Sequence, residues 1–159
     1  TSKYLSVIRQ FNNIDQNKLN QLIKQIKNTK NIYIIGVHYS SLPAKHLVLG
    51  LQDLGINTYF AYDYMQASHL YNTIHEDDLL IYFSIEGNQN NVSRFFDLTN
   101  ASKNTYIITL NPKPKLLIEN TLILPGYTLS KQSIVDLQSI VVIFVELLLN
   151  MFHNTLKED

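Results

Sequence analysis

Short apolar runs rich in β-branched residues alternate with helix-like stretches along most of this chain, and this alternation restricts the fold more than any other feature. We predict strands at 32–35, 57–61, 79–83, 106–108 and 121–124. Helical patterns lie between them, at 41–54, 65–71, 90–102 and 115–118. Strict alternation is typical of a parallel sheet with helices on both faces. The sequence therefore predicts an α/β fold, a three-layer α/β/α sandwich around a five-stranded parallel sheet of flavodoxin-like order 2-1-3-4-5.

Helix signals outside the sheet region divide the chain into three parts. Asp15 is a suitable N-cap for a helix that reaches about Asn28, and Gly55 is a suitable cap at the end of the 41–54 helix. Ser130 or Ser133 is expected to begin a long last helix that reaches about residue 152. Because we find no repeat and no linker, we expect a single domain over 1–159, with a leading helical segment at 1–30, an α/β core at 31–125 and a long C-terminal helix at 130–153.

The composition excludes several classes of protein. The 159 residues contain 13 Lys+Arg and 13 Asp+Glu, and a neutral chain of this size is poorly suited to hold nucleic-acid phosphates by charge alone. Cys is 0, which excludes a disulfide framework, a thiolate nucleophile and a Cys-ligated metal. No apolar leader opens the chain, and the longest apolar run, at 140–149, is too short to span a bilayer. We therefore expect a soluble, cytoplasmic protein that does not contact a membrane.

The last helix is expected to make a second contact besides its contact with the sheet. From 140 to 149 the only polar residue is Glu146, so the helix is apolar nearly all round. One face can pack on the sheet, and the opposite face then needs another partner. A symmetric homodimer through the C-terminal helix is the simplest arrangement.

Two segments that follow predicted strands carry the residues best placed to bind a ligand. G-V-H-Y-S-S at 36–41 follows the first strand, and S-I-E-G-N-Q at 84–89 follows the third. In the predicted order these two strands are neighbours at the point where the order of strand addition reverses. The crevice beyond their carboxyl ends is the usual ligand site of such sheets. Each segment opens a helix, where N–H groups and hydroxyls can bind phosphate or sugar oxygens. The alternative for Ser40 and Ser41 is that they only cap the next helix.

Three segments of the chain resemble the SIS (sugar isomerase) phosphosugar-binding family. I-I-G-V-H-Y-S at 34–40 looks like its first signature, a strand followed by G-x-G-x-S. D-D-L-L-I-Y-F-S-I-E-G-N-Q at 77–89 is similar to its second, an acidic turn and strand that lead to S-x-S-G-x-T. Y-I-I-T at 106–109 resembles its fourth strand. The resemblance runs from about residue 31 to 124 and implies a site for a sugar phosphate or related sugar derivative.

Within that family, these segments and the basic leading helix look most like the C-terminal effector domain of RpiR-type transcription regulators. In those proteins a helix-turn-helix domain precedes the SIS domain. The chain has no room for it and begins with Thr1 rather than Met. We therefore expect the sensor part of a regulator, which would reach DNA only through the missing N-terminal domain.

The chain departs from the family pattern at three positions of the two turns. His38 stands where the second Gly is usual, Glu86 where the second Ser is usual, and Gln89 where the Thr is usual. A carboxylate about 4 Å from a phosphate is repelled by roughly 1–4 kcal/mol, depending on the effective dielectric. Three explanations are open. Glu86 points away and backbone N–H groups bind phosphate; or Glu86 favours a cationic or neutral ligand, such as an amino sugar or an unphosphorylated derivative; or the site has decayed and the domain only dimerises.

Taken together, the turns and the resemblance define the predicted ligand-binding residues: His38, Tyr39, Ser40, Ser41, Ser84, Glu86, Gly87, Asn88 and Gln89. No two histidines have the i, i+4 spacing of a helical metal site, and we predict no metal and no cofactor. Aldose–ketose isomerisation needs a base near neutral pKa at the reacting carbon, and we predict no catalytic residue. A sensor is therefore expected rather than an enzyme, with a phosphosugar isomerase and a domain that only dimerises as the alternatives.

Overall fold

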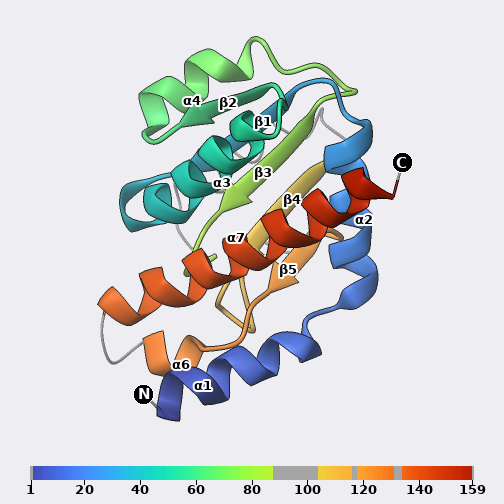
Figure 1. Ribbon diagram of the computed structural model, residues 1–159. Coiled ribbons are helices and arrows are strands. Elements are labelled where there is room, and N and C mark those ends of the chain that lie inside the picture. Colours follow the sequence, from blue (N-terminus) through green and yellow to red (C-terminus); the bar gives the residue numbers. More distant parts are fainter. Residues whose placement is uncertain (1, 88–103, 116–117, 131–133, 159) are drawn as a thin grey trace.

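The computed structural model describes residues 2–87, 104–115, 118–130 and 134–158, and all structural statements concern these ranges (Figure 1). The elements follow one another as α1 (Ser2–Arg9), η1 (Gln10–Asn13), α2 (Gln16–Asn28), β1 (Ile32–Gly36), η2 (His38–Ser40), α3 (Ser41–Asp53), β2 (Thr58–Ala61), α4 (Tyr64–Tyr71), β3 (Leu79–Phe83), β4 (Thr105–Thr109), β5 (Thr121–Ile123), α6 (Tyr127–Ser130) and α7 (Ile134–Lys157), where η denotes a 3₁₀ helix.

The five strands form one sheet in the order β2-β1-β3-β4-β5, and all neighbouring pairs are parallel. This confirms the predicted order 2-1-3-4-5 and the α/β/α architecture. β1 lies between β2, which forms one edge of the sheet, and β3, which is the central strand (Figure 1). β2 is thus added on one side of β1 and the later strands on the other, so the order in which strands are added reverses between β1 and β3, as predicted.

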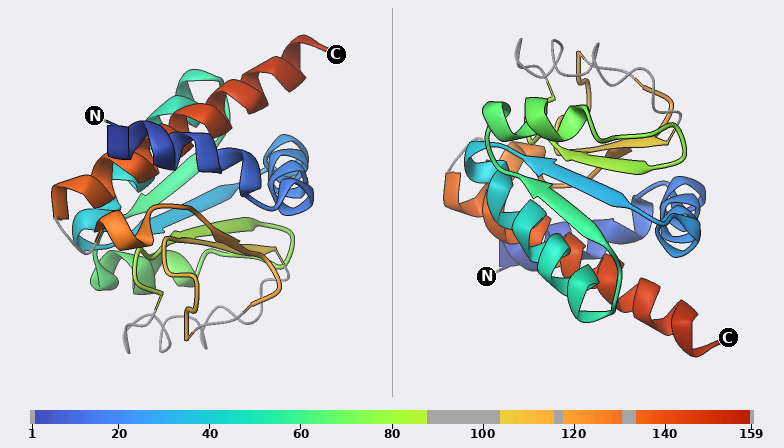
Figure 2. Two further views of the ribbon diagram at one scale, coloured as in Figure 1. Left: turned by 90° about the horizontal axis from the view of Figure 1, so that it is seen from below. Right: turned by 90° about the horizontal axis from the view of Figure 1, so that it is seen from above.

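Side chains of the strands alternate between two hydrophobic clusters, one on each face of the sheet. In β1, Ile32 and Ile34 belong to the larger cluster, whereas Tyr33 and Ile35 belong to the smaller one. Residues of α1, α2, α3 and α7 complete the larger cluster, and α4 contributes to the smaller one on the opposite face (Figure 2). Because helices cover both faces, both sets of alternating side chains are apolar, which explains the continuous apolar strand runs in the sequence.

Two predicted helix ends are confirmed. The Asp15 carboxylate accepts a hydrogen bond from the N–H of Lys18 at 3.1 Å and caps α2. At the end of α3, Gly55 has a φ of +81°, and the N–H of Ile56 donates to the carbonyl oxygen of Leu51 at 3.0 Å. This is the αL ending that glycine favours after a helix.

The long C-terminal helix α7 extends further than predicted, to Lys157. By length and composition, its segment Ser139–Lys157 is apolar enough to cross a membrane. In this fold, however, Phe144 and Phe152 are buried in the larger cluster, and α7 packs against α1, α2, α3 and α6. These contacts bury 33% of that segment within the chain, while Leu147 stays 40% exposed.

Short helices account for most differences from the prediction. The helices α1, η1, η2 and α6 were not predicted as separate elements. Ser130, which was a candidate start of the last helix, belongs to α6 instead. The other candidate, Ser133, lies outside the described residues, as does the helix predicted at 90–102, and the helical turn predicted at 115–118 lies partly outside them.

Candidate functional site

The two predicted turns leave the sheet at the same edge. Gly36, the last residue of β1, pairs with Phe83, the last residue of β3. The segments that follow are therefore neighbours at the carboxyl ends of adjacent parallel strands. Ser40 and Ser84 are both buried there, at 8% and 6% exposure. Their role in ligand binding stays a prediction.

The turn after β1 folds back tightly on the strand end. A Cβ on Gly36 would lie 2.3 Å from the carbonyl oxygen of Ser40, so glycine is required at this position. His38 has a φ of +56°, a left-handed conformation that residues other than glycine rarely adopt, and both His38 and Tyr39 are exposed. Ser41 Oγ donates to the carbonyl oxygen of His38 at 2.6 Å. Ser40 occupies the N-cap position of α3 but makes no side-chain capping hydrogen bond, so capping does not account for its hydroxyl.

In the turn after β3, a serine and a glycine organise the backbone. Ser84 Oγ accepts a hydrogen bond from the N–H of Gly87 at 3.1 Å, which leaves its own proton available for a ligand oxygen. Gly87 has a φ of +64°, and a Cβ there would lie 2.7 Å from Pro114 Cβ. Among the described residues, the N–H groups of Ile85 and Glu86 have no hydrogen-bond acceptor. The turn therefore offers two backbone donors and one hydroxyl donor within three consecutive residues.

Residues at the end of β4 and in the segments after β4 and β5 brace this second turn. Thr109 Oγ1 donates to the carbonyl oxygen of Ile85 at 2.9 Å, and Asn111 Nδ2 donates to that of Glu86 at 2.7 Å. The hydroxyl of Tyr127 in α6 donates to Glu86 Oε2 at 3.2 Å. Thr109 and Asn111 are buried, so these bonds form where water competes little. The backbone of Glu86 and its carboxylate are thus held by two different parts of the chain.

These contacts show which way Glu86 points along the sheet edge. Both of its partners follow strands on the β4 and β5 side of β3, whereas the Ser40 turn follows β1 on the other side. The carboxylate itself is held toward the β5 side by its bond from Tyr127. Because Coulomb repulsion falls as separation grows, this favours the first of the three explanations, in which Glu86 points away and backbone donors bind the anion.

Sequence reasoning placed seven of its nine site residues on the two described turns, while Asn88 and Gln89 lie outside the described residues. It missed the bracing residues Thr109, Asn111 and Tyr127. A signal existed for Asn111, because Asn-Pro directly after a strand is typical of a turn whose first side chain bonds nearby backbone. Nothing local in the sequence pointed to Tyr127, which is 41 residues from its partner.

Two tyrosines have pKa values that burial perturbs. Burial, with smaller contributions from the charge and hydrogen bond of Tyr64, raises the pKa of Tyr82, and burial alone raises the pKa of Tyr106. Both therefore stay protonated at neutral pH and neither supplies a general base. Within the described ranges, no three His, Asp or Glu side chains are grouped so as to hold a metal ion.

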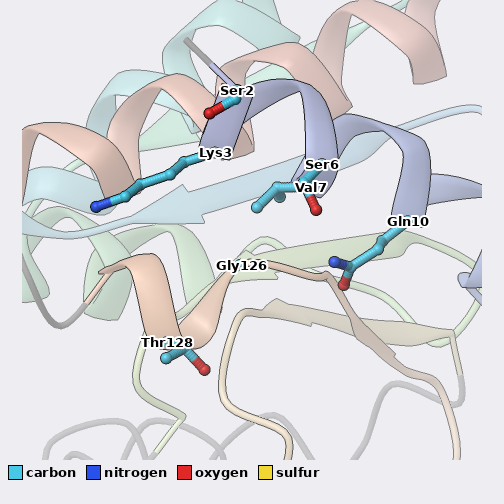
Figure 3. A pocket seen from close by; sticks show the side chains of 7 residues that line it. All are labelled: Ser2, Lys3, Ser6, Val7, Gln10, Gly126 and Thr128. Carbon is cyan, nitrogen blue, oxygen red and sulfur yellow. The ribbon is translucent and has the colours of Figure 1, made fainter.

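Two adjoining cavities are lined by described residues outside these two turns. The first, about 450 Å³, separates α1 from α6; Figure 3 shows Lys3, Ser6 and Gln10 on one side and Thr128 on the other. The second, about 330 Å³, shares Gln10, Gly126 and Thr128 with the first and is also lined by Tyr127. No predicted ligand-binding residue is among the lining residues of either cavity.

Comparison with known proteins identifies the fold. No family model matches the sequence, and no curated protein matches it. Among solved structures, the Vibrio vulnificus NanR protein complexed with ManNAc-6P matches with a TM-score of 0.81 and 18% identity over 99% of this chain. The sugar isomerase domain of an RpiR transcription factor from Sphaerobacter thermophilus matches with a TM-score of 0.76 and 16% identity, over 99% of this chain and 89% of that one. This chain spans only 61% of the NanR chain.

A structure interpreted as an enzyme matches too, with a lower TM-score. A Methanococcus jannaschii protein, whose structure was interpreted as that of a 3-hexulose-6-phosphate isomerase, matches with a TM-score of 0.70 and 23% identity over 98% of this chain and 88% of that one. The likeness thus extends over regulators and isomerases alike. From its strand order and from these likenesses, this chain has the fold of the SIS (sugar isomerase) domain.

Proposed function

We propose that this chain is the ligand-sensing effector domain of a bacterial transcription regulator and that it binds a sugar phosphate at the turns after β1 and β3. The observation that carries the proposal is the Ser84–Gly87 turn, in which the N–H groups of Ile85 and Glu86 and the Ser84 hydroxyl are available as donors beside the Ser40 turn. Oriented backbone N–H groups of this kind bind phosphate. The similar NanR structure is complexed with a sugar phosphate, ManNAc-6P, which supports this ligand class.

DNA contact would belong to a separate domain, because a neutral chain is poorly suited to hold a phosphate backbone. The similarity to the sugar isomerase domain of an RpiR transcription factor supports this division of labour, and such a regulator would act in the cytoplasm. A ligand can shift a conformational equilibrium only by binding its states differently. The sensed signal would therefore be a ligand-dependent change in the geometry of a homodimer.

A surface formed by α3 and α7 fits such a dimer. His46 of α3 and Glu146 of α7 form an ion pair across these helices. Leu42 and Leu49 lie one turn to either side of His46, and Leu147 follows Glu146; all three leucines are 40% exposed or more. An apolar patch around two polar side chains that bond each other is self-complementary, as a two-fold interface requires. Leu49→Lys with Leu147→Lys should convert a dimer into a monomer in light scattering; a wild-type monomer would contradict this interface.

The ligand proposal is tested by thermal unfolding with sugar phosphates, amino sugars and free sugars. Binding to the folded state at 100 times Kd stabilises it by about 2.7 kcal/mol, which for a domain of this size raises Tm by roughly 5–10 °C. ManNAc-6P and other sugar phosphates should give such shifts, and Ser40→Ala should reduce them. Ser68→Ala on α4, where the hydroxyl bonds its own helix, is the matched control. No shift with any phosphorylated sugar would contradict the proposal.

Two substitutions that restore the family pattern test where the site lies. Glu86→Ser with Gln89→Thr should strengthen binding of sugar phosphates because it adds two hydroxyl donors to the second turn. Unchanged affinity in this double variant would show that the ligand binds elsewhere.

A phosphosugar isomerase is the second candidate, favoured by the likeness to the Methanococcus jannaschii protein. His38 lies in the turn after β1, and its imidazole is the candidate base for this reaction. NMR of a sugar phosphate incubated with the purified protein would show conversion of aldose to ketose. Turnover abolished by His38→Gln would support an enzyme, and binding without turnover supports the sensor.

A further inference from the structure

Glu86 is the feature that distinguishes this chain's second turn, and the structure shows what restrains it. Its carbonyl oxygen accepts from Asn111 Nδ2 at 2.7 Å, and its Oε2 accepts from the Tyr127 hydroxyl at 3.2 Å. We propose that Tyr127 is a positioning residue that holds the Glu86 carboxylate on the β5 side and so lets the turn accept a phosphate dianion. This inference rests on the proposed phosphate site.

The physical reason is competition for the same donors. A glutamate carboxylate is itself an anion, and the N–H groups of Ile85 and Glu86 lie on its own turn. Without the bond from Tyr127, the exposed side chain is free to adopt rotamers nearer these N–H groups, where it repels and displaces a phosphate. The hydroxyl of Tyr127 bonds to a charged acceptor, which is stronger than a bond between neutral groups.

The position of α6 suits this role. Tyr127 is the first residue of α6, α6 packs on α7, and the preceding Gly126 has a φ of +108°. A Cβ on Gly126 would lie 2.7 Å from Ile140 Cδ1, so the start of α6 is closely packed against α7. Tyr127 is therefore presented from a fixed support rather than from a loose loop.

A double-mutant cycle tests the proposal. Affinities for ManNAc-6P, for unphosphorylated ManNAc and for inorganic phosphate are measured by calorimetry on wild type, Tyr127→Phe, Glu86→Gln and the double variant. Tyr127→Phe should weaken binding of both phosphates about fivefold, the size of one net hydrogen bond, and leave ManNAc unchanged. In the Glu86→Gln background the same change should have no effect, because no carboxylate is left to restrain. Thr128→Ala, the next residue of α6, is the control and should bind like wild type.

Each other outcome overturns the inference in a distinguishable way. Equal phosphate affinity in wild type and Tyr127→Phe would show that the bond does not position Glu86 for binding. An equal loss in the Glu86→Gln background would show that Tyr127 acts by another route, and an equal loss for ManNAc would show a merely structural role. If wild type binds neither inorganic phosphate nor any sugar phosphate, the proposed function itself fails.

Discussion

Replacing Gly87 by alanine should destabilise the protein more than the same replacement of Gly55. Their φ values are +64° and +81°, so each alanine costs about 1–2 kcal/mol for a left-handed L-residue. A Cβ on Gly87 would lie 2.7 Å from Pro114 Cβ and 3.2 Å from Thr109 Oγ1, whereas one on Gly55 meets nothing within 4 Å. Such overpacking costs a further 1–3 kcal/mol, approximately. We expect losses in unfolding free energy of about 2–5 kcal/mol for Gly87→Ala and about 1–2 kcal/mol for Gly55→Ala.

Urea unfolding followed by circular dichroism measures both losses under the same conditions. Because Gly55 is in open space, the difference between the variants isolates the contact of the second turn with Pro114. Gly87→Ala should also lose ManNAc-6P binding, while Gly55→Ala keeps it. If Gly87→Ala costs no more than Gly55→Ala, the turn is not packed against Pro114 and our description of the donor geometry is wrong.

Three further predictions concern buried polar groups. Within the described ranges the fully buried Tyr106 hydroxyl has no hydrogen-bond partner, so Tyr106→Phe should raise the free energy of unfolding in urea by about 1 kcal/mol; a loss would contradict this. Burial raises the pKa of Tyr82 above its unfolded value of 10.0. The contribution of Tyr82 to folding stability is therefore fully present below pH 10.0 and declines as the pH rises further, because the phenol loses its proton first in the unfolded state. Tyr82→Phe should make the alkaline decline shallower by about 1.4 kcal/mol per pH unit in urea titrations, and an unchanged slope would refute the assignment. Asn111→Ala, which removes bonds to Glu86 and Lys113, should cost about 2 kcal/mol on thermal or urea unfolding, and a neutral effect would show that the brace is unimportant.

The sheet was predictable because its signals are local. Runs such as Ile32–Ile35 are apolar and rich in β-branched residues, which is typical of a buried strand. The helix caps at Asp15 and Gly55 involve hydrogen bonds between residues only three to five positions apart. Strand order then followed from the alternation with helices. The short helices α1 and α6 were harder to predict, because a few turns or less carry little periodicity and are stabilised by packing on α7.

The position of the candidate site was predictable for the same reason, since neighbouring parallel strands end at one edge. The orientation of Glu86 was not. It depends on Asn111 and Tyr127, which are 25 and 41 residues away and come to it through the fold. The sequence alone therefore left three explanations for this glutamate; its hydrogen bonds favour the first, which stays a prediction.

NMR chemical-shift mapping with ManNAc-6P is the most direct test of the account. Amide shifts in a ¹⁵N spectrum report which N–H groups meet the ligand. We predict the largest changes at Ile85, Glu86 and Gly87, with a second set at Ser40. Changes confined to the cavity between α1 and Thr128, or no changes at millimolar ligand, would contradict a phosphate site at these two turns.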